Sequence, residues 1–169
     1  MKPIIKTILI LSLTISSYAQ SNLDINNLTP FVGNWEWVNG NQTFKVEIFI
    51  EDNYLKGHYK LVETNNGVEN EIYKSNIPMG GDQGWLFGPV IFGGSYDGIL
   101  FGANIKDNVL YAEGTHNTKD GDLEFIIQDS CATCPITATW KISKTLGMRS
   151  TKTPENFTIP IDIILTKVN

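Results

Sequence analysis

Short segments in which apolar and polar residues alternate run along most of this chain, and turn residues separate them. In the first clear hairpin, Asn39-Gly40 lies between the segment around Trp35 and residues 43–50, and we expect both turn residues to have positive φ. Alternation with a period of two is typical of half-buried β-strands rather than helices. In residues 43–50 it places one set of side chains on a single face: Phe44, Val46, Ile48 and Ile50.

Similar segments follow at short intervals, including residues 109–115 and the clean alternation of 136–143. Residues 68–76 form an expected strand that is polar on both faces, which predicts a place at an edge or rim of the sheet. About eight to ten antiparallel strands are expected, a number typical of barrels and sandwiches. We predict a single antiparallel up-and-down β-barrel, with a two-sheet β-sandwich as the alternative. The residues before the first strand predict a short helical turn, because Pro30 restricts the backbone where that turn would end.

The segment that leads into the first strand carries Leu28, Phe31 and Gly33, and Trp35 stands at the start of that strand. Gly33 has no side chain, which lets another backbone approach the entrance of the strand. A tryptophan at the mouth of a curling sheet, capped by Leu28 and Phe31, predicts a plug at the closed end of a barrel.

Residues 1–19 have the pattern of a secretory signal peptide. Lys2 and Lys6 provide the basic start, residues 8–15 form a short apolar run, and Ser17-Tyr18-Ala19 supplies small residues before Gln20. The apolar run is too short to span a bilayer. We therefore expect residues 20–169 to form one exported domain, periplasmic or extracellular, without a membrane span.

Charge limits the classes of partner. The chain of 169 residues has a net charge of −5, and the expected mature chain has −7 because the leader contains Lys2 and Lys6 and no acidic residue. Such an acidic domain lacks the basic surface with which proteins bind nucleic acid or anionic membranes. We expect neither as a partner.

Cys131-Ala132-Thr133-Cys134-Pro135 is the one reactive-looking motif. A thioredoxin-type pair needs its first cysteine at a helix N-terminus, whereas residues 136–140 favour a strand. A zinc site would need two more ligands, and only His58 and His116 are available as histidines. In an exported chain the motif favours a small disulfide loop between Cys131 and Cys134; redox activity, metal binding and free thiols remain the alternatives.

The Gly33-Asn34-Trp35 element, preceded by Phe31, resembles the start of a lipocalin or related calycin barrel. In lipocalins a late arginine packs across that tryptophan. Arg149 is the only arginine of this chain, but it precedes the last strand rather than standing in a matching motif, so the role is not carried over.

The chain also resembles a bacterial family of small exported proteins of unknown function. The shared features are the Phe31-Val32-Gly33-x-Trp35 opening, Asn39-Gly40, Gly57-x-Tyr59 and the late Cys131-x-x-Cys134. The resemblance implies a lipocalin-like fold and supplies no catalytic residues.

Two hypotheses for function follow. In the first, the barrel holds a small apolar or amphipathic ligand, because an eight-stranded barrel has an interior just large enough for one. Alternation predicts these inward, ligand-contacting residues: Trp35, Phe44, Tyr59, Phe101, Phe125 and Trp140.

In the second hypothesis the interior is filled by side chains, and the protein is an interaction module of the cell envelope or extracellular space. Its contact loop would be Trp85, Leu86 and Phe87, large apolar side chains in a glycine-rich segment. An enzyme has the least support, because we find no catalytic constellation. The sequence predicts no cofactor and no metal site.

Overall fold

The computed structural model describes residues 24–79, 86–111, 117–128, 131, 133–145 and 155–168. A short helix, α2 (Ile25–Leu28), and a single 3-10 turn, η1 (Thr29–Phe31), lead into the sheet. The strands are β1 (Gly33–Asn39), β2 (Gln42–Glu51), β3 (Tyr54–Asn65), β4 (Val68–Lys74), β5 (Ile91–Gly94), β6 (Leu100–Asp107), β7 (Lys119–Ile127), β8 (Thr137–Lys144) and β9 (Asp162–Val168).

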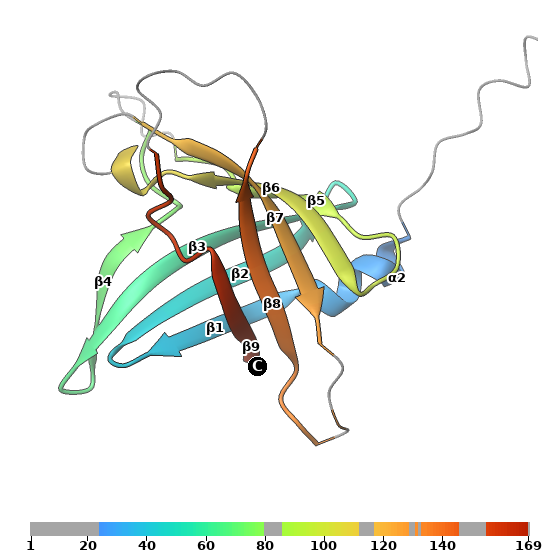
Figure 1. Ribbon diagram of the computed structural model, residues 1–169, viewed down its shortest axis with the longest axis horizontal. Helices are drawn as coiled ribbons and strands as arrows, with labels where there is room; N and C mark the ends of the chain where they lie inside the picture. The colour runs from blue at the N-terminus through green and yellow to red at the C-terminus, as the bar shows by residue number, and fades with distance from the viewer. Residues whose placement is uncertain are drawn as a thin grey trace, which may run out of the picture.

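The strands form an antiparallel barrel rather than a sandwich. Each strand of the ring pairs with its neighbour, and the first strand β1 pairs with the last, β9. Eight strands close the ring, and β4 lies outside it, beside β3 (Figure 1). The seam between β1 and β9 is short and includes the pair Trp35 and Lys167.

Two different strands share one edge of the long strand β3. Its first part, Leu55 to Gly57, pairs with β5, and its second part, from Lys60 onward, pairs with β4. The chain between β4 and β5 is held to β3 at both ends, where Ser75 N–H donates to Tyr59 O and Val90 N–H donates to Gly57 O. The polar strand β4 is therefore at the edge of the sheet, as its polar faces predict.

The β1–β2 and β3–β4 hairpins follow their turn residues with one correction. Asn39 pairs with Gln42, so Gly40-Asn41 forms the first turn, and of these two residues only Gly40 has positive φ, at 64°. The predicted Asn39-Gly40 turn was therefore one residue out of place. Glycine at the first central position suits a type II′ turn, whereas Asn66-Gly67 has positive φ at both central positions, as an Asn-Gly turn should.

The N-terminal segment plugs one end of the barrel, as predicted. Leu28 and Phe31 are completely buried, and the Phe31 ring centroid lies 5.6 Å from that of Phe101. The Trp35 Nε1–H donates a hydrogen bond of 2.9 Å to the Phe31 carbonyl oxygen. This bond joins the plug to the first strand and satisfies a buried polar group.

Gly33 is required for a different reason from the predicted one. Its φ is 132°, a conformation that side chains rarely adopt, and a Cβ there would lie 3.1 Å from Lys167 Cε. The close neighbour is therefore a side chain rather than another backbone. The Lys167 ammonium itself donates a hydrogen bond to the Pro30 carbonyl oxygen in the plug.

The predicted strand over 109–115 was wrong in its described part, because residues 109–111 form a helical turn. The Val109 N–H donates to the Asp107 carboxylate at 3.1 Å, and the Tyr111 N–H donates to Asn108 O. Local capping by an aspartate side chain competes with strand pairing and ends β6. Residues 112–116 lie outside the described residues.

Candidate functional site

The six predicted ligand-contacting side chains lie together inside the barrel. Each is at most 2% exposed. Their rings form one connected cluster in which Phe125 is central, with centroid distances of 4.9 Å to Trp35 and 6.3 Å to both Phe101 and Trp140. Phe44 extends the cluster, 5.7 Å from Trp140 and 5.8 Å from Tyr59.

The polar atoms of these aromatic side chains also have protein partners. Trp140 Nε1–H donates to the Pro160 carbonyl oxygen at 2.9 Å. The Tyr59 hydroxyl accepts the Asn108 backbone N–H at 3.1 Å and lies 3.0 Å from Asn108 Oδ1. Burial raises the pKa of Tyr59 far above its usual value. The cluster thus behaves as a packed core, with its rings in mutual contact and its hydrogen bonds satisfied internally.

A polar groove of about 440 Å³ lies on the outer face of β1, β2 and β3. Lys45 is central in it, with its Nζ 2.6 Å from Glu69 and 3.6 Å from Glu36. The hydrogen bond with Glu69 raises the pKa of Lys45, and these charges largely satisfy one another within the protein.

His58, also in this groove, is tied to the barrel wall. Its Nδ1 lies 3.1 Å from Ser75 Oγ, which accepts the Tyr59 backbone N–H. The Ser75 hydroxyl is therefore free to donate its proton to a neutral His58. Burial lowers the pKa of His58, which favours the same neutral form. Because Ser75 is completely buried, this pair stabilises the junction of β3 with the end of β4.

A second outer groove, of about 480 Å³, has a different character. It lies over β5, β6 and the start of β3, and aromatic side chains and glycines line most of it. Sequence reasoning missed this groove, because the alternation pattern assigns outward residues to solvent without saying which of them meet across strands. The available signal is Gly102, a glycine in the middle of an otherwise regular alternation.

The predicted contact loop is only partly described. Trp85 lies outside the described residues. Leu86 is 54% exposed, and the Phe87 N–H donates to Ile77 O while its ring packs edge-on against Tyr111 at 4.9 Å. Leu86 is therefore available to solvent, whereas Phe87 is held against the barrel.

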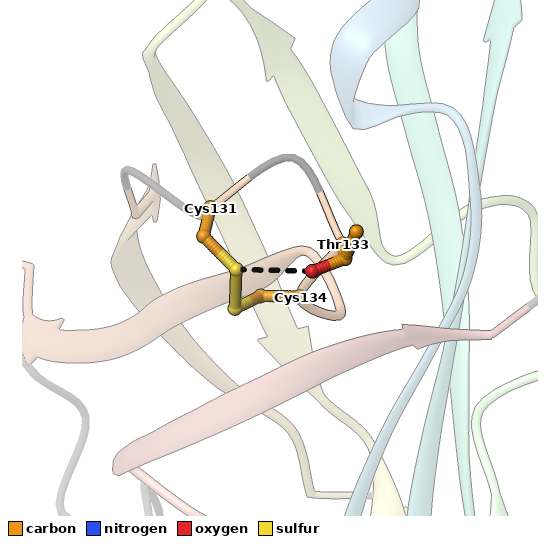
Figure 2. The surroundings of a disulfide bond; sticks show 3 residues. All are labelled: Cys131, Thr133 and Cys134. Atoms are coloured by element: carbon orange, nitrogen blue, oxygen red, sulfur yellow. Dashed lines mark hydrogen bonds between the residues drawn. A yellow bond between two sulfur atoms is a disulfide. The ribbon is translucent and has the colours of Figure 1, made fainter.

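The disulfide between Cys131 and Cys134 is present, in the loop that joins β7 to β8 (Figure 2). Both cysteines are exposed, and the Thr133 hydroxyl lies 3.6 Å from Cys131 Sγ. Strand β8 begins at Thr137, so the helix that a thioredoxin-type pair requires is replaced by a strand.

Neither a metal centre nor a membrane span is indicated where the structure is described. There, histidine, cysteine and acidic side chains form no group of three suited to hold a metal ion. None of the helices in the described ranges has the length and apolar character needed to cross a bilayer.

Comparison with known proteins gives a family without an assigned activity. A search of curated proteins found no match, and a search of solved structures also found none. A model of a protein family matches residues 1–168. The chain therefore belongs to the family of unknown function DUF6705.

Proposed function

We propose that this protein is an exported, non-enzymatic interaction module of the cell envelope or extracellular space, whose barrel interior is filled by its own side chains. Of the two hypotheses that the sequence leaves open, the packing favours this one. The observation that carries it is the connected cluster of six buried rings, which occupies the place where a carried ligand would lie.

Export has separate support. Residues 1–19 have the pattern of a cleavable leader, and disulfides persist mainly outside the reducing cytoplasm. The exposed position of Cys131 and Cys134 makes their oxidised state depend on the compartment rather than on burial. A binding module in an oxidising compartment would retain this bond.

Native mass spectrometry tests the proposal. The full chain, expressed with its own leader in a Gram-negative host, would be purified from the periplasm or medium and sprayed under gentle conditions. We expect the mass of residues 20–169 less two hydrogens for the disulfide, with no added mass. A co-purified molecule that leaves on denaturation would support ligand carriage instead, and uncleaved protein in the cytoplasm would contradict export.

A further inference from the structure

The aromatic groove on the outer face of β5 and β6 is an exposed apolar surface of unusual composition. Tyr54, Phe92 and Leu100 are 41–43% exposed around it, and Tyr96 is 79% exposed. Large apolar groups gathered on the outside of a small protein indicate a binding surface more often than scattered single ones do.

The floor of this groove is made of glycine for two different reasons. Gly93 must be glycine, because a Cβ there would lie 2.1 Å from the Gly102 carbonyl oxygen. Gly102 itself faces outward, has no positive φ, and would meet nothing within 4 Å if it carried a Cβ. Neither packing nor backbone geometry explains Gly102, although glycine weakens a strand interior. What its missing side chain provides is open space above β6.

Ring faces and free polar groups lie next to one another in the groove. The ring centroids of Tyr54 and Phe92 are 4.9 Å apart, with the planes inclined by 36°. Asn104 stands opposite Phe92 in the β5–β6 register. Within the described part of the chain, the side-chain amide of Asn104 and the hydroxyls of Tyr54 and Tyr96 make no hydrogen bond.

The lining of the groove itself suits a neutral ligand. No aspartate, glutamate, histidine, lysine or arginine is among the residues that line the groove. Asp97, close by in the sequence, uses its carboxylate to accept the N–H groups of Ile99 and Leu100. The net charge of −5 disfavours anions. The exposed Asp122 and Glu124 stand on β7 opposite Asn104 and Gly102, so their carboxylates are available to accept sugar hydroxyls at the edge of the groove.

We propose that this groove binds a neutral saccharide. The C–H face of a pyranose ring would pack on Tyr54 and Phe92 above Gly102, and its hydroxyls would bond to the Asn104 amide and the Tyr96 hydroxyl. A volume of about 480 Å³ suits one or two sugar rings. This names the partner chemistry of the interaction module proposed above, and it rests on that function in placing the partner outside the barrel.

Two-dimensional ¹H–¹⁵N NMR of the folded, disulfide-bonded protein tests the site directly. The probes are maltose, cellobiose and N,N′-diacetylchitobiose. We expect at least one of them to shift the backbone amides of Gly93, Gly94 and Gly102 and the side-chain amide of Asn104. The indole N–H signals of Trp35 and Trp140, inside the barrel, should not move.

Variants test whether the saccharide binds in this groove. Phe92→Ala removes a ring, and Gly102→Val fills the open space with a residue that strands favour; each should weaken saccharide binding roughly tenfold or more. Ile164→Ala is the matched control, because Ile164 is an outward side chain on β9 that is 60% exposed and outside the groove. Its affinity should equal that of the wild type.

Each remaining outcome separates the two proposals. If no probe shifts the groove amides, or if Gly102→Val binds like the wild type, the saccharide site is wrong while the filled barrel stands. If the groove amides respond to protein concentration instead, the surface binds a second copy and the saccharide proposal fails. If a probe shifts the indole signals of Trp35 and Trp140, the interior accepts ligands and the proposed function fails.

Discussion

The ammonium of Lys167 lies 5.3 Å from the ring centroid of Trp35 and donates a hydrogen bond of 2.9 Å to the carbonyl oxygen of Pro30. One side chain thus links the last strand, the first strand and the N-terminal plug. Trp35 and Lys167 are also register partners at the short β1–β9 seam, so this contact stabilises the closure of the barrel.

We predict that Lys167→Ala lowers the free energy of unfolding by about 1–2 kcal/mol, since it removes a cation–π contact and a charged hydrogen bond. Lys167→Arg should retain most of the stability, because a guanidinium can make both interactions. Urea unfolding measures the difference. The exposed Lys74→Ala, which breaks only a surface ion pair with Glu71, is the control. Equal stability of the two alanine variants would contradict the assigned role.

Phe125 should be among the most sensitive core positions. Its ring meets those of Phe31, Trp35, Phe101 and Trp140. Phe125→Ala is expected to lower the free energy of unfolding by about 3–5 kcal/mol, because it removes ring contacts and leaves a cavity.

Phe92→Ala removes the same kind of ring from the outer face and should lower the free energy of unfolding by about 1 kcal/mol or less. Chemical denaturation of the two variants under identical conditions compares them. A Phe125→Ala variant no less stable than Phe92→Ala would mean that the interior is not packed as described.

His58 should make stability depend on pH. Burial lowers its folded-state pKa below the ordinary value of 6.5, although Glu47 partly opposes the shift. The unfolded state therefore binds the proton more readily. The stability associated with the neutral His58 is fully present above pH 6.5, and it is lost as pH falls through 6.5 toward the lower folded-state pKa.

Urea unfolding from pH 8 to pH 5 measures this effect. In His58→Gln the side-chain oxygen can still accept the Ser75 hydroxyl proton but cannot titrate, so the variant should lose less stability over that range than the wild type does. Parallel profiles for the two proteins would show that His58 does not titrate as inferred.

The disulfide should make a modest contribution to the stability of the folded protein. Cys131 and Cys134 are three residues apart, and closing so short a loop stabilises by about 2 kcal/mol in the chain-entropy model. For the wild type, the melting temperature should be lower with dithiothreitol than without it. The Cys131→Ser, Cys134→Ser double variant should match the reduced protein and ignore the reductant; a melting temperature equal to that of the oxidised protein would contradict a stabilising role.

Local patterns predicted much of the fold. The six aromatic residues that period-two alternation predicted to face inward are all buried, because burial on one face of a strand leaves a direct trace in the sequence. Turn residues located the β1–β2 and β3–β4 hairpins to within one position, but they did not locate the start of β7, which begins at Lys119. The misplacement at Asn39-Gly40 arose because an Asn-Gly pair suits a type I′ turn, whereas the chain uses Gly40-Asn41.

Long-range arrangements escaped prediction. The sharing of β3 between β4 and β5 depends on pairings that no local pattern encodes. The lipocalin resemblance points only to an arginine as the cation on Trp35, whereas the residue in that place is Lys167, whose contact depends on the β1–β9 register. The outer groove was missed for the same reason, since Tyr54, Phe92 and Gly102 meet only across strands.

The central claim is that the barrel is closed around its own side chains and binds at its surface. The most direct test is a crystal structure of the exported protein, purified without refolding. We predict that the protein's own buried side chains, with the rings of Phe44, Phe101 and Trp140 among them, account for all electron density inside the barrel. Continuous unassigned density between these rings, in the shape of a bound molecule, would contradict the account.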